Sequence, residues 1–325
     1  SDYFCTDTCK NFELPFKLIQ GTVFATCTKK RVLTWGSLKA MELVIALGMN
    51  GIVWGLIIAL IALGLSIIFG LLDIINIAHG DFFMVGTVMA WFVFDATGNY
   101  WLAFAIVPIV GFALGALIEY TVIQPIKNAA ALSIVATFGL SIILQEGVRA
   151  TFGATPARLT APIEGTVLLF GLEYEIYRLF AALLSIAAIC CFFLFLHRTK
   201  LGTWMRAVRF DPETATAMGI PARRVYMVTF AIGFAMAALG GVVAGPITTV
   251  DFQAGVDILP FCFMAVIIGG LGNMEGTVAA AVMLAFFEGV MASFTDPTLA
   301  RIGSLCLMSV VLLVRPHGIF LGATR

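Results

Sequence analysis

Three polar residues lie close together within a long apolar stretch of the chain: Asn76, His79 and Asp81. A neighbouring imidazole and carboxylate can exchange protons, bind a coupling ion or hydrogen-bond to the backbone of a broken helix. We interpret all three as candidates for a transport pathway or gate. Two other readings stay open: Asn76 and His79 simply tie broken helix ends together, or Asp73 and Asp81 lie at the level of the lipid headgroups.

A second polar segment, residues 269–276, interrupts an apolar run in the other half of the chain and contains Asn273. Like the first, it combines glycines, an asparagine and an acid between two apolar runs. Paired interruptions of this kind are typical of transporters that have internal repeats and a site near the middle of the membrane. The pattern predicts broken or re-entrant segments, a possible internal repeat, and Asn273 as a further pathway candidate.

The segment 198–224 is a charged loop between apolar runs. It holds six basic residues (Arg198, Lys200, Arg206, Arg209, Arg223 and Arg224) and two acids (Asp211 and Glu213). Loops rich in Lys and Arg remain on the cytoplasmic side of a membrane. We therefore place this loop inside the cell and residues 152–177 outside.

The same loop contains a short predicted helix with recognisable ends. Asp211 suits the N-cap, Pro212 the first helical position and Glu213 the positive end of the helix dipole. Ala215 belongs to its body, and Gly219 suits the left-handed residue after its end. So short a helix is not stable alone. We expect it to be held by the ends of neighbouring spans or by a soluble partner.

Composition defines the fold class. Hydrophobic residues make up 61% of the 325 residues and charged residues 12%, about half the charge of a soluble domain. Long uncharged runs can cross about 30 Å of hydrocarbon as helices, and they lack the alternation of barrel strands. The predicted spans are 43–72, 80–95, 100–122, 130–151, 177–197, 225–247, 258–272, 276–294 and 299–315. The prediction is an all-α, polytopic integral membrane protein with about 8–10 transmembrane helices.

Several function classes lack support in the sequence. No His/Cys cluster has metal-ligand spacing, and no glycine loop of the Walker type is present. No nucleophile and base stand in a catalytic arrangement, and the net charge of zero gives no reason to expect nucleic acid. We therefore expect no cofactor and no metal, and nothing in these residues indicates an enzyme.

Four ordered sets of motifs resemble those of permease subunits in branched-chain amino acid ABC importers. They are Ile74–Gly86; Gln124–Asn128 with Thr137–Gln145; Arg206–Glu213 with Met218–Ile220; and Ile267–Gly276 with Arg315–Phe320. The chain looks most like the smaller membrane subunit, which has no fused ATPase. The resemblance covers residues 50–320, so residues 41–325 are expected to be the permease domain and residues 1–40 an extension of unknown role.

The resemblance implies an ATP-driven importer of branched-chain or other hydrophobic amino acids in the bacterial inner membrane. Its expected partners are the lipid bilayer, a second related permease subunit, two cytoplasmic ATPase subunits and a periplasmic substrate-binding protein. The resemblance assigns Arg206 and the helix at 211–219 to ATPase coupling, and it adds Gln145 to the pathway candidates.

Three alternatives remain. Close relatives with the same motifs carry urea or short amides. An ion-coupled secondary carrier would use His79 and Asp81 and need no ATPase, and an intramembrane enzyme would use the same pair as acid and base. Co-purification with ATPase subunits would separate the importer from the last two.

The charges near the predicted span ends indicate where selectivity resides. Glu119, Glu146, Arg149 and Glu288 are expected at the membrane interface rather than at a binding site. We expect a path lined mainly by Met, Phe and Ala with few fixed charges, and selection by the binding protein rather than by the permease.

Overall fold

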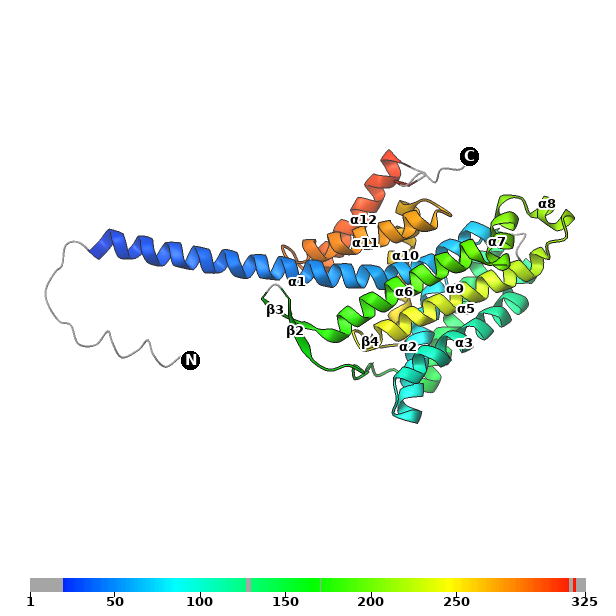
Figure 1. The fold of residues 1–325 in the computed structure, drawn as a ribbon, viewed down its shortest axis with the longest axis horizontal. Coiled ribbons are helices and arrows are strands. Elements are labelled where there is room, and N and C mark those ends of the chain that lie inside the picture. The colour runs from blue at the N-terminus through cyan, green and yellow to red at the C-terminus, as the bar shows by residue number, and fades with distance from the viewer. Residues whose placement is uncertain (1–19, 127–129, 170, 316–317, 320–325) are drawn as a thin grey trace. The chain divides into compact units, whose positions relative to one another are not determined.

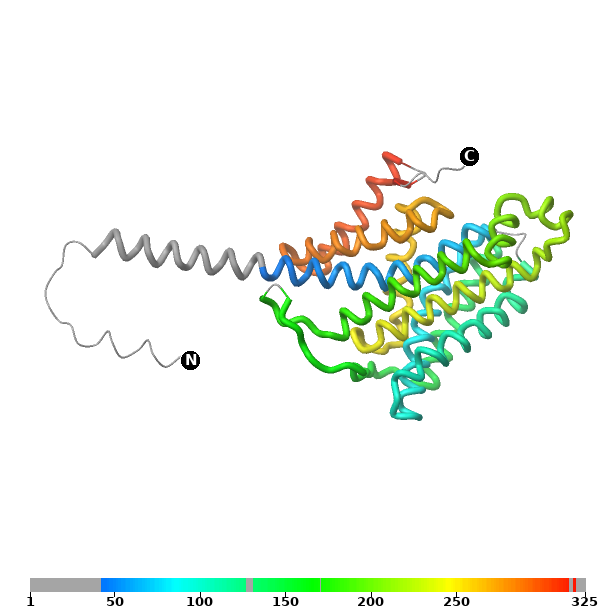
Figure 2. The backbone as a smooth tube through the Cα atoms, viewed as in Figure 1, coloured from blue at the N-terminus to red at the C-terminus, as the bar shows by residue number. Residues whose placement is uncertain are grey.

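A computed structural model describes residues 20–126, 130–169, 171–315 and 318–319 of the chain (Figures 1 and 2). The first nineteen residues of the predicted extension therefore lie outside the described part. The chain divides into two compact units, Ser1–Ile45 and Ala46–Arg325. The first contains the start of helix α1, whose bounds are Gln20–Leu72. Everything that follows concerns the second unit.

Helices build almost all of the second unit. After α1 come α2 (His79–Thr97), α3 (Trp101–Ile118), the π-helix η1 (Glu119–Ile123), α4 (Gln124–Ile126), α5 (Ala130–Phe152), α6 (Ile176–Arg198), α7 (Lys200–Phe210), α8 (Pro212–Ala217), α9 (Ala222–Ala244), α10 (Ala254–Gly269), α11 (Met274–Met291) and α12 (Pro297–Val314). Two short antiparallel pairs complete it, β1 (Ala157–Arg158) with β4 (Thr249–Val250) and β2 (Thr166–Leu169) with β3 (Leu172–Glu175).

Among the described residues, seven helical segments are long and apolar enough to cross a membrane. They are Glu42–Leu72, Trp101–Ile126, Ala131–Phe152, Ile176–Arg198, Ala222–Ala244, Met274–Met291 and Pro297–Val314. Helix α10 is apolar but shorter, and α2 begins with the polar residues His79 and Asp81. These nine segments match the nine predicted spans to within a few residues. The chain is an all-α, multi-pass membrane protein.

Helices α1 and α9 form the centre of the bundle, because most of each span is buried inside the protein. Small residues let their backbones approach closely. A β-carbon added at Gly64 would lie only 2.6 Å from the carbonyl oxygen of Gly233 in α9. Beside this contact the Phe82 ring of α2 stacks on Phe234 at 4.0 Å between ring centres.

The two ends of the bundle differ in chemistry. One end carries α7, α8 and the basic loop, and we call it the inner end. The other carries the short strands, and we call it the outer end (Figure 1). Helix α6 runs from the outer to the inner end and α9 returns. At the outer end the hydroxyl groups of Tyr100 and Tyr177 donate to the Val242 and Val243 carbonyls, which ties α3 and α6 to α9.

Candidate functional site

The chain breaks between α1 and α2, as the sequence predicted. Asp73 has a left-handed backbone with φ of 55°, and its N–H donates to the Phe69 carbonyl. Residues 73–78 then run without helical structure. The Thr137 hydroxyl of α5 lies against this segment, because it accepts a hydrogen bond from the Ile77 N–H at 3.3 Å. Backbone groups freed by the break therefore find a partner on a neighbouring helix.

His79 ties the start of α2 to the middle of α1. Its Nε2 donates to the Ile61 carbonyl at 2.9 Å, since a carbonyl can only accept. Ile61 lies eleven residues before the end of α1, which is about 16 Å along the helix axis. The unwound segment therefore returns the chain from the inner end toward the middle of the bundle, and α2 starts there.

Asn76 and His79 are fully buried, yet part of their hydrogen-bonding capacity is unused. Neither the amide nitrogen nor the amide oxygen of Asn76, nor Nδ1 of His79, has a partner among the described residues. Leaving such a group unpaired in a dry interior costs about 1–3 kcal/mol. The hydrogen bond to Ile61 ties His79 to α1, whereas the Asn76 side chain makes no hydrogen bond within the described part of the chain, and Asn76 stays a pathway candidate.

Asp81 is buried among helices rather than exposed to headgroups. Only 2% of its surface is accessible, and the Gln145 side chain of α5 donates to its Oδ1 at 3.0 Å. The same Gln145 nitrogen lies 2.9 Å from the Ser141 hydroxyl oxygen. The alternative that placed Asp81 at the headgroup level is therefore wrong, while Asp73 is exposed. The reason is tertiary packing: α5 supplies polar partners that the sequence near Asp81 does not contain.

The starts of α2 and α10 meet beside Asp81. A β-carbon at Gly80 would lie 2.1 Å from the Gly255 carbonyl oxygen, and one at Gly255 would lie 2.7 Å from Asp81 Oδ1. Two helix N-termini thus converge on one carboxylate, which their dipoles stabilise. The structure places Asn76, His79, Asp81 and Gln145 along one break, and whether they form a pathway stays a prediction. It also adds Ser141 and Gly255, which the prediction missed. The four-residue spacing of Ser141 and Gln145 was a usable signal.

Asn273 lies elsewhere, at the inner end. It caps α11, because its Oδ1 accepts from the Gly276 N–H at 3.1 Å. Gly270 and Gly272, which both precede it, have positive φ. This second break lies close to the end of α1, since a β-carbon at Gly70 would lie 3.1 Å from the Gly272 Cα. Asn273 is thus a helix cap that is separate from the Asp81 cluster.

The short helix in the basic loop has the predicted ends. The Asp211 carboxylate accepts from the N–H groups of Glu213 and Thr214, and Pro212 stands at the first position. Gly219 has φ of 85°. The Ile220 N–H donates to the Ala215 carbonyl and the Gly219 N–H to Thr216, the double closure of a Schellman motif. Hydrogen bonds from the Thr214 hydroxyl and N–H hold the pKa of the Asp211 carboxyl below its ordinary value.

Arg206 belongs to a second helix that the sequence analysis did not predict. Helix α7 is capped by Thr199, whose hydroxyl accepts from the Gly202 N–H at 3.1 Å. From it, Arg206 donates to the Leu196 carbonyl at the end of α6. A threonine three residues before a glycine at the end of an apolar span was the missed signal.

A cavity of about 330 Å³ lies between these inner-end elements. Arg206 and Arg209 of α7 and the α11 residues around Asn273 line it. A β-carbon at Gly272 would lie 2.8 Å from an Arg209 nitrogen, so the guanidinium rests on the second break. Arg209 of α7 thus lies against Gly272 of the second break and near Gly70 at the end of α1.

One interface prediction is wrong. Glu119 has 1% of its surface accessible and is buried in η1 rather than interfacial. Glu146 and Arg149 are exposed and pair with each other at 3.3 Å. The error arises because hydropathy locates Glu119 along the helix axis but does not show which neighbours cover it.

Taken together, a multi-pass helical bundle with broken helices inside it and a capped helix exposed on its basic side defines a membrane transport subunit. A family model described as the permease component of branched-chain amino acid transport systems matches residues 48–314. The chain belongs to this family and is a permease subunit.

Individual relatives agree with the family match. The permease protein LivH of the high-affinity branched-chain amino acid transport system of Escherichia coli is 28% identical over 83% of this chain and 93% of its own length. BraD of Pseudomonas aeruginosa, from a system of the same description, is 27% identical with the same coverage. LivM of E. coli, also a permease protein, is 23% identical over 81% of this chain and 68% of its own length. No solved structure matches the chain significantly.

Proposed function

We propose that this chain is the smaller type of permease subunit in an ATP-driven importer of branched-chain or other hydrophobic amino acids. The observation that carries the coupling part of the proposal is the exposed helix α8. Both ends of this helix are capped by residues of the same loop. The apolar side chains beside it, Phe210 and Met218, are 91% and 80% exposed. Large apolar side chains left in water mark a contact surface.

ATP hydrolysis takes place on two separate cytoplasmic subunits in this proposal, and α8 is the element that they move. Arg206 and Arg209 join α7 to the end of α6 and to the second break. A displacement of α8 therefore reaches the broken segments through packed, hydrogen-bonded elements, which is what mechanical coupling requires.

The remaining partners follow from the relatives and the surface. LivH and LivM are both named as permease proteins of one kind of system, which supports a second related permease subunit beside this chain. Helices α3, α5, α6 and α12 leave most of their apolar surface outside the bundle, which suits that subunit and the lipid bilayer. A periplasmic binding protein delivers the substrate, and the complex resides in a bacterial inner membrane.

Coupling is tested with two substitutions at one residue. Gly219→Val places a β-branched residue at φ of 85°, while no heavy atom lies within 4 Å of the new β-carbon. The strain is therefore confined to the backbone, of order 1 kcal/mol or more. Gly219→Asn is the matched control, because asparagine tolerates this conformation.

The readouts are complex assembly, substrate-stimulated ATP hydrolysis and uptake in proteoliposomes. We expect both variants to assemble, the Val variant to lose uptake and stimulated hydrolysis, and the Asn variant to retain them. Normal uptake by the Val variant at normal expression would refute the coupling role.

The substrate is tested separately. Purified binding proteins with different specificities are added to one reconstituted permease–ATPase complex. Uptake should follow the binding protein supplied. If uptake were restricted to urea or a short amide with every compatible binding protein, the proposed amino acid substrate would be wrong and the amide would take its place.

A further inference from the structure

A cavity of about 340 Å³ opens at the outer end of the bundle, opposite the basic loop. Helix α1, the start of α6, the turn after α9 and the end of α11 enclose it. Its volume falls in the range of small-ligand sites. It is separate from the Asp81 cluster and from the inner-end cavity.

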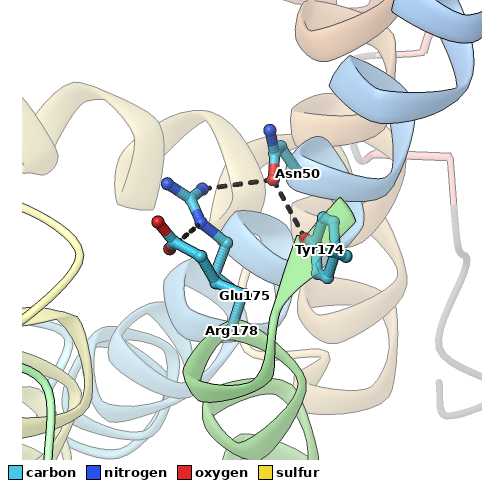
Figure 3. A network of polar contacts seen from close by, with 4 residues as sticks. All are labelled: Asn50, Tyr174, Glu175 and Arg178. Carbon is cyan, nitrogen blue, oxygen red and sulfur yellow. Dashed lines mark hydrogen bonds and ion pairs between the residues drawn. The ribbon is translucent and has the colours of Figure 1, made fainter. Parts of the chain in front are cut away.

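Arg178 stands in the wall of this cavity and is held there by a polar network (Figure 3). Its Nε donates to Glu175 at 2.8 Å, and its Nη1 donates to Asn50 Oδ1 at 3.1 Å. The Tyr174 hydroxyl donates to the same Asn50 oxygen at 2.9 Å. Asn50 belongs to α1, so the network fixes the guanidinium in place from two elements. Its third nitrogen, Nη2, has no hydrogen-bond partner within the described part of the chain.

Glu288 of α11 lines the same cavity and is half-buried. No cationic nitrogen of the described residues lies within 4.0 Å of its carboxylate. The cavity thus presents a fixed cation and a carboxylate that forms no ion pair within 4.0 Å in the described part of the chain, although the Arg301 guanidinium of α12 interacts with this carboxylate electrostatically at longer range. The walls between them are apolar, formed by Leu47, Val53, Trp54 and Ile247.

Close packing holds α1, whose Asn50 accepts from Arg178, against α11, which carries Glu288. A β-carbon at Gly51 of α1 would lie 2.6 Å from the Ala285 carbonyl oxygen, and one at Gly289 of α11 would lie 2.5 Å from the Leu47 carbonyl oxygen. Backbone-to-backbone contact on both sides leaves little freedom for α1 and α11 to slide. A rigid frame that displays charges in a fixed arrangement is how proteins recognise small charged ligands.

We propose that this outer cavity binds a free amino acid in its zwitterionic form, with the α-carboxylate at Arg178, the α-ammonium at Glu288 and an apolar side chain against Trp54 and its neighbours. The inference rests on the proposed transport of amino acids and adds a receiving site on this subunit. Neither a neutral amide nor a simple ion would use both charges.

The site also refines the sequence expectation of a path with few fixed charges. Arg178 and Glu288 stand near the ends of their helices, so the charge they supply lies at the mouth of the bundle. A transported ligand must be released again, so its binding site has to be weak. A guanidinium that is already bonded to Glu175 binds a carboxylate less tightly than an unshared one would.

The test measures leucine binding to the complete importer complex in nanodiscs without binding protein, with two analogues as competitors. Leucinamide lacks the carboxylate, and 4-methylpentanoate lacks the ammonium. The variants are Arg178→Gln and Glu288→Gln. Glu146→Gln, an exposed carboxylate on α5 outside the cavity, is the control. ATP-driven leucine uptake with binding protein is recorded in parallel for every form.

We expect leucine to bind the unmodified complex and to be displaced poorly by either analogue. Arg178→Gln should weaken leucine binding roughly tenfold and remove the preference over leucinamide. Glu288→Gln should remove the preference over 4-methylpentanoate, and Glu146→Gln should change nothing. A merely structural role would weaken binding of all three compounds together.

The inference is overturned if both analogues compete with the unmodified complex as well as leucine does, a result that needs no variant to fold. It is also overturned if leucine affinity is unchanged in the assembled variants while uptake persists. Absence of leucine uptake by the unmodified complex would instead overturn the proposed function.

Discussion

Helix α8 and the start of α2 are both places where the chain departs from simple spans, but they are stabilised in opposite ways. Helix α8 is completed by neighbours in sequence, Asp211 at one end and Gly219 at the other. The start of α2 has no side-chain cap and depends on α1, α5 and α10, through Ile61, Gln145 and Gly255. Because α8 is stabilised by residues next to it in sequence, its surface stays free for a partner. The surface at the start of α2 is instead buried in contacts that hold the bundle together.

The largest effect is expected where the start of α2 meets α10. Gly80→Ala would place a β-carbon 2.1 Å from the Gly255 carbonyl oxygen, a backbone atom that cannot move cheaply. Because the contacted atom is backbone, we expect a loss of about 4 kcal/mol or more in stability, above the usual cost of overpacking. Gly139→Ala in α5, where no atom lies within 4 Å of the new β-carbon, is the control. Thermal unfolding in detergent should separate them, and equal melting temperatures would show that this contact is not tight.

Next in size is the contrast between His79 and Asp81. His79→Ala removes a buried ring and the partner of the Ile61 carbonyl, at a cost of about 2–4 kcal/mol. Asp81→Asn keeps a hydrogen-bonding group beside Gln145 and should lose less uptake. Uptake measured against pH for both variants tests the difference. Abolished transport and a lost pH dependence in Asp81→Asn would favour the ion-coupled carrier instead.

A smaller effect is expected at the cap of α8. Asp211→Ala leaves the N–H groups of Glu213 and Thr214 without their acceptor and should reduce substrate-stimulated ATP hydrolysis about fivefold. Asp211→Asn should stay near normal, because asparagine caps helices as well as aspartate does. An equal loss in both variants would mean that the charge of Asp211, rather than the cap, matters.

The pH dependence of the same cap has a definite sign. Because the pKa of Asp211 is lowered in the folded protein, the carboxylate stabilises α8 above its ordinary pKa, and this contribution is lost only as the pH falls through the lowered value. Stimulated hydrolysis should therefore not vary through Asp211 between about pH 5 and 8. A difference between the pH profiles of the unmodified complex and Asp211→Asn in this range would contradict the assignment.

The smallest effect is expected at Asn273. If it only caps α11, Asn273→Ser keeps an acceptor for the Gly276 N–H and should change uptake by less than about twofold. Asn273→Ala should lower stability by about 1 kcal/mol. A large loss of uptake in the serine variant, with normal assembly, would return Asn273 to the pathway.

The contrast between α8 and the start of α2 also explains which features of the structure can be predicted from the sequence. Spans depend on hydropathy and α8 on adjacent residues, so both are predictable to within a few positions. The burial of Asp81 and Glu119 and the meeting of Gly80 with Gly255 depend on packing between distant segments. The prediction paired the two glycine-rich breaks. In the structure Gly272 of the second break lies close to Gly70 at the end of α1, and the starts of α2 and α10 meet at Asp81.

The claim that α8 binds a soluble ATPase subunit is tested most directly by site-specific photo-crosslinking in the purified complex. A photoreactive residue replaces Met218 beside α8, or Leu168 in β2, which are 80% and 73% exposed. Crosslinking to the ATPase subunit from position 218 alone, with a yield that changes when ATP is bound, is the result we predict. No crosslink from position 218 in a complex active in uptake, or equal crosslinking from both positions, would contradict it.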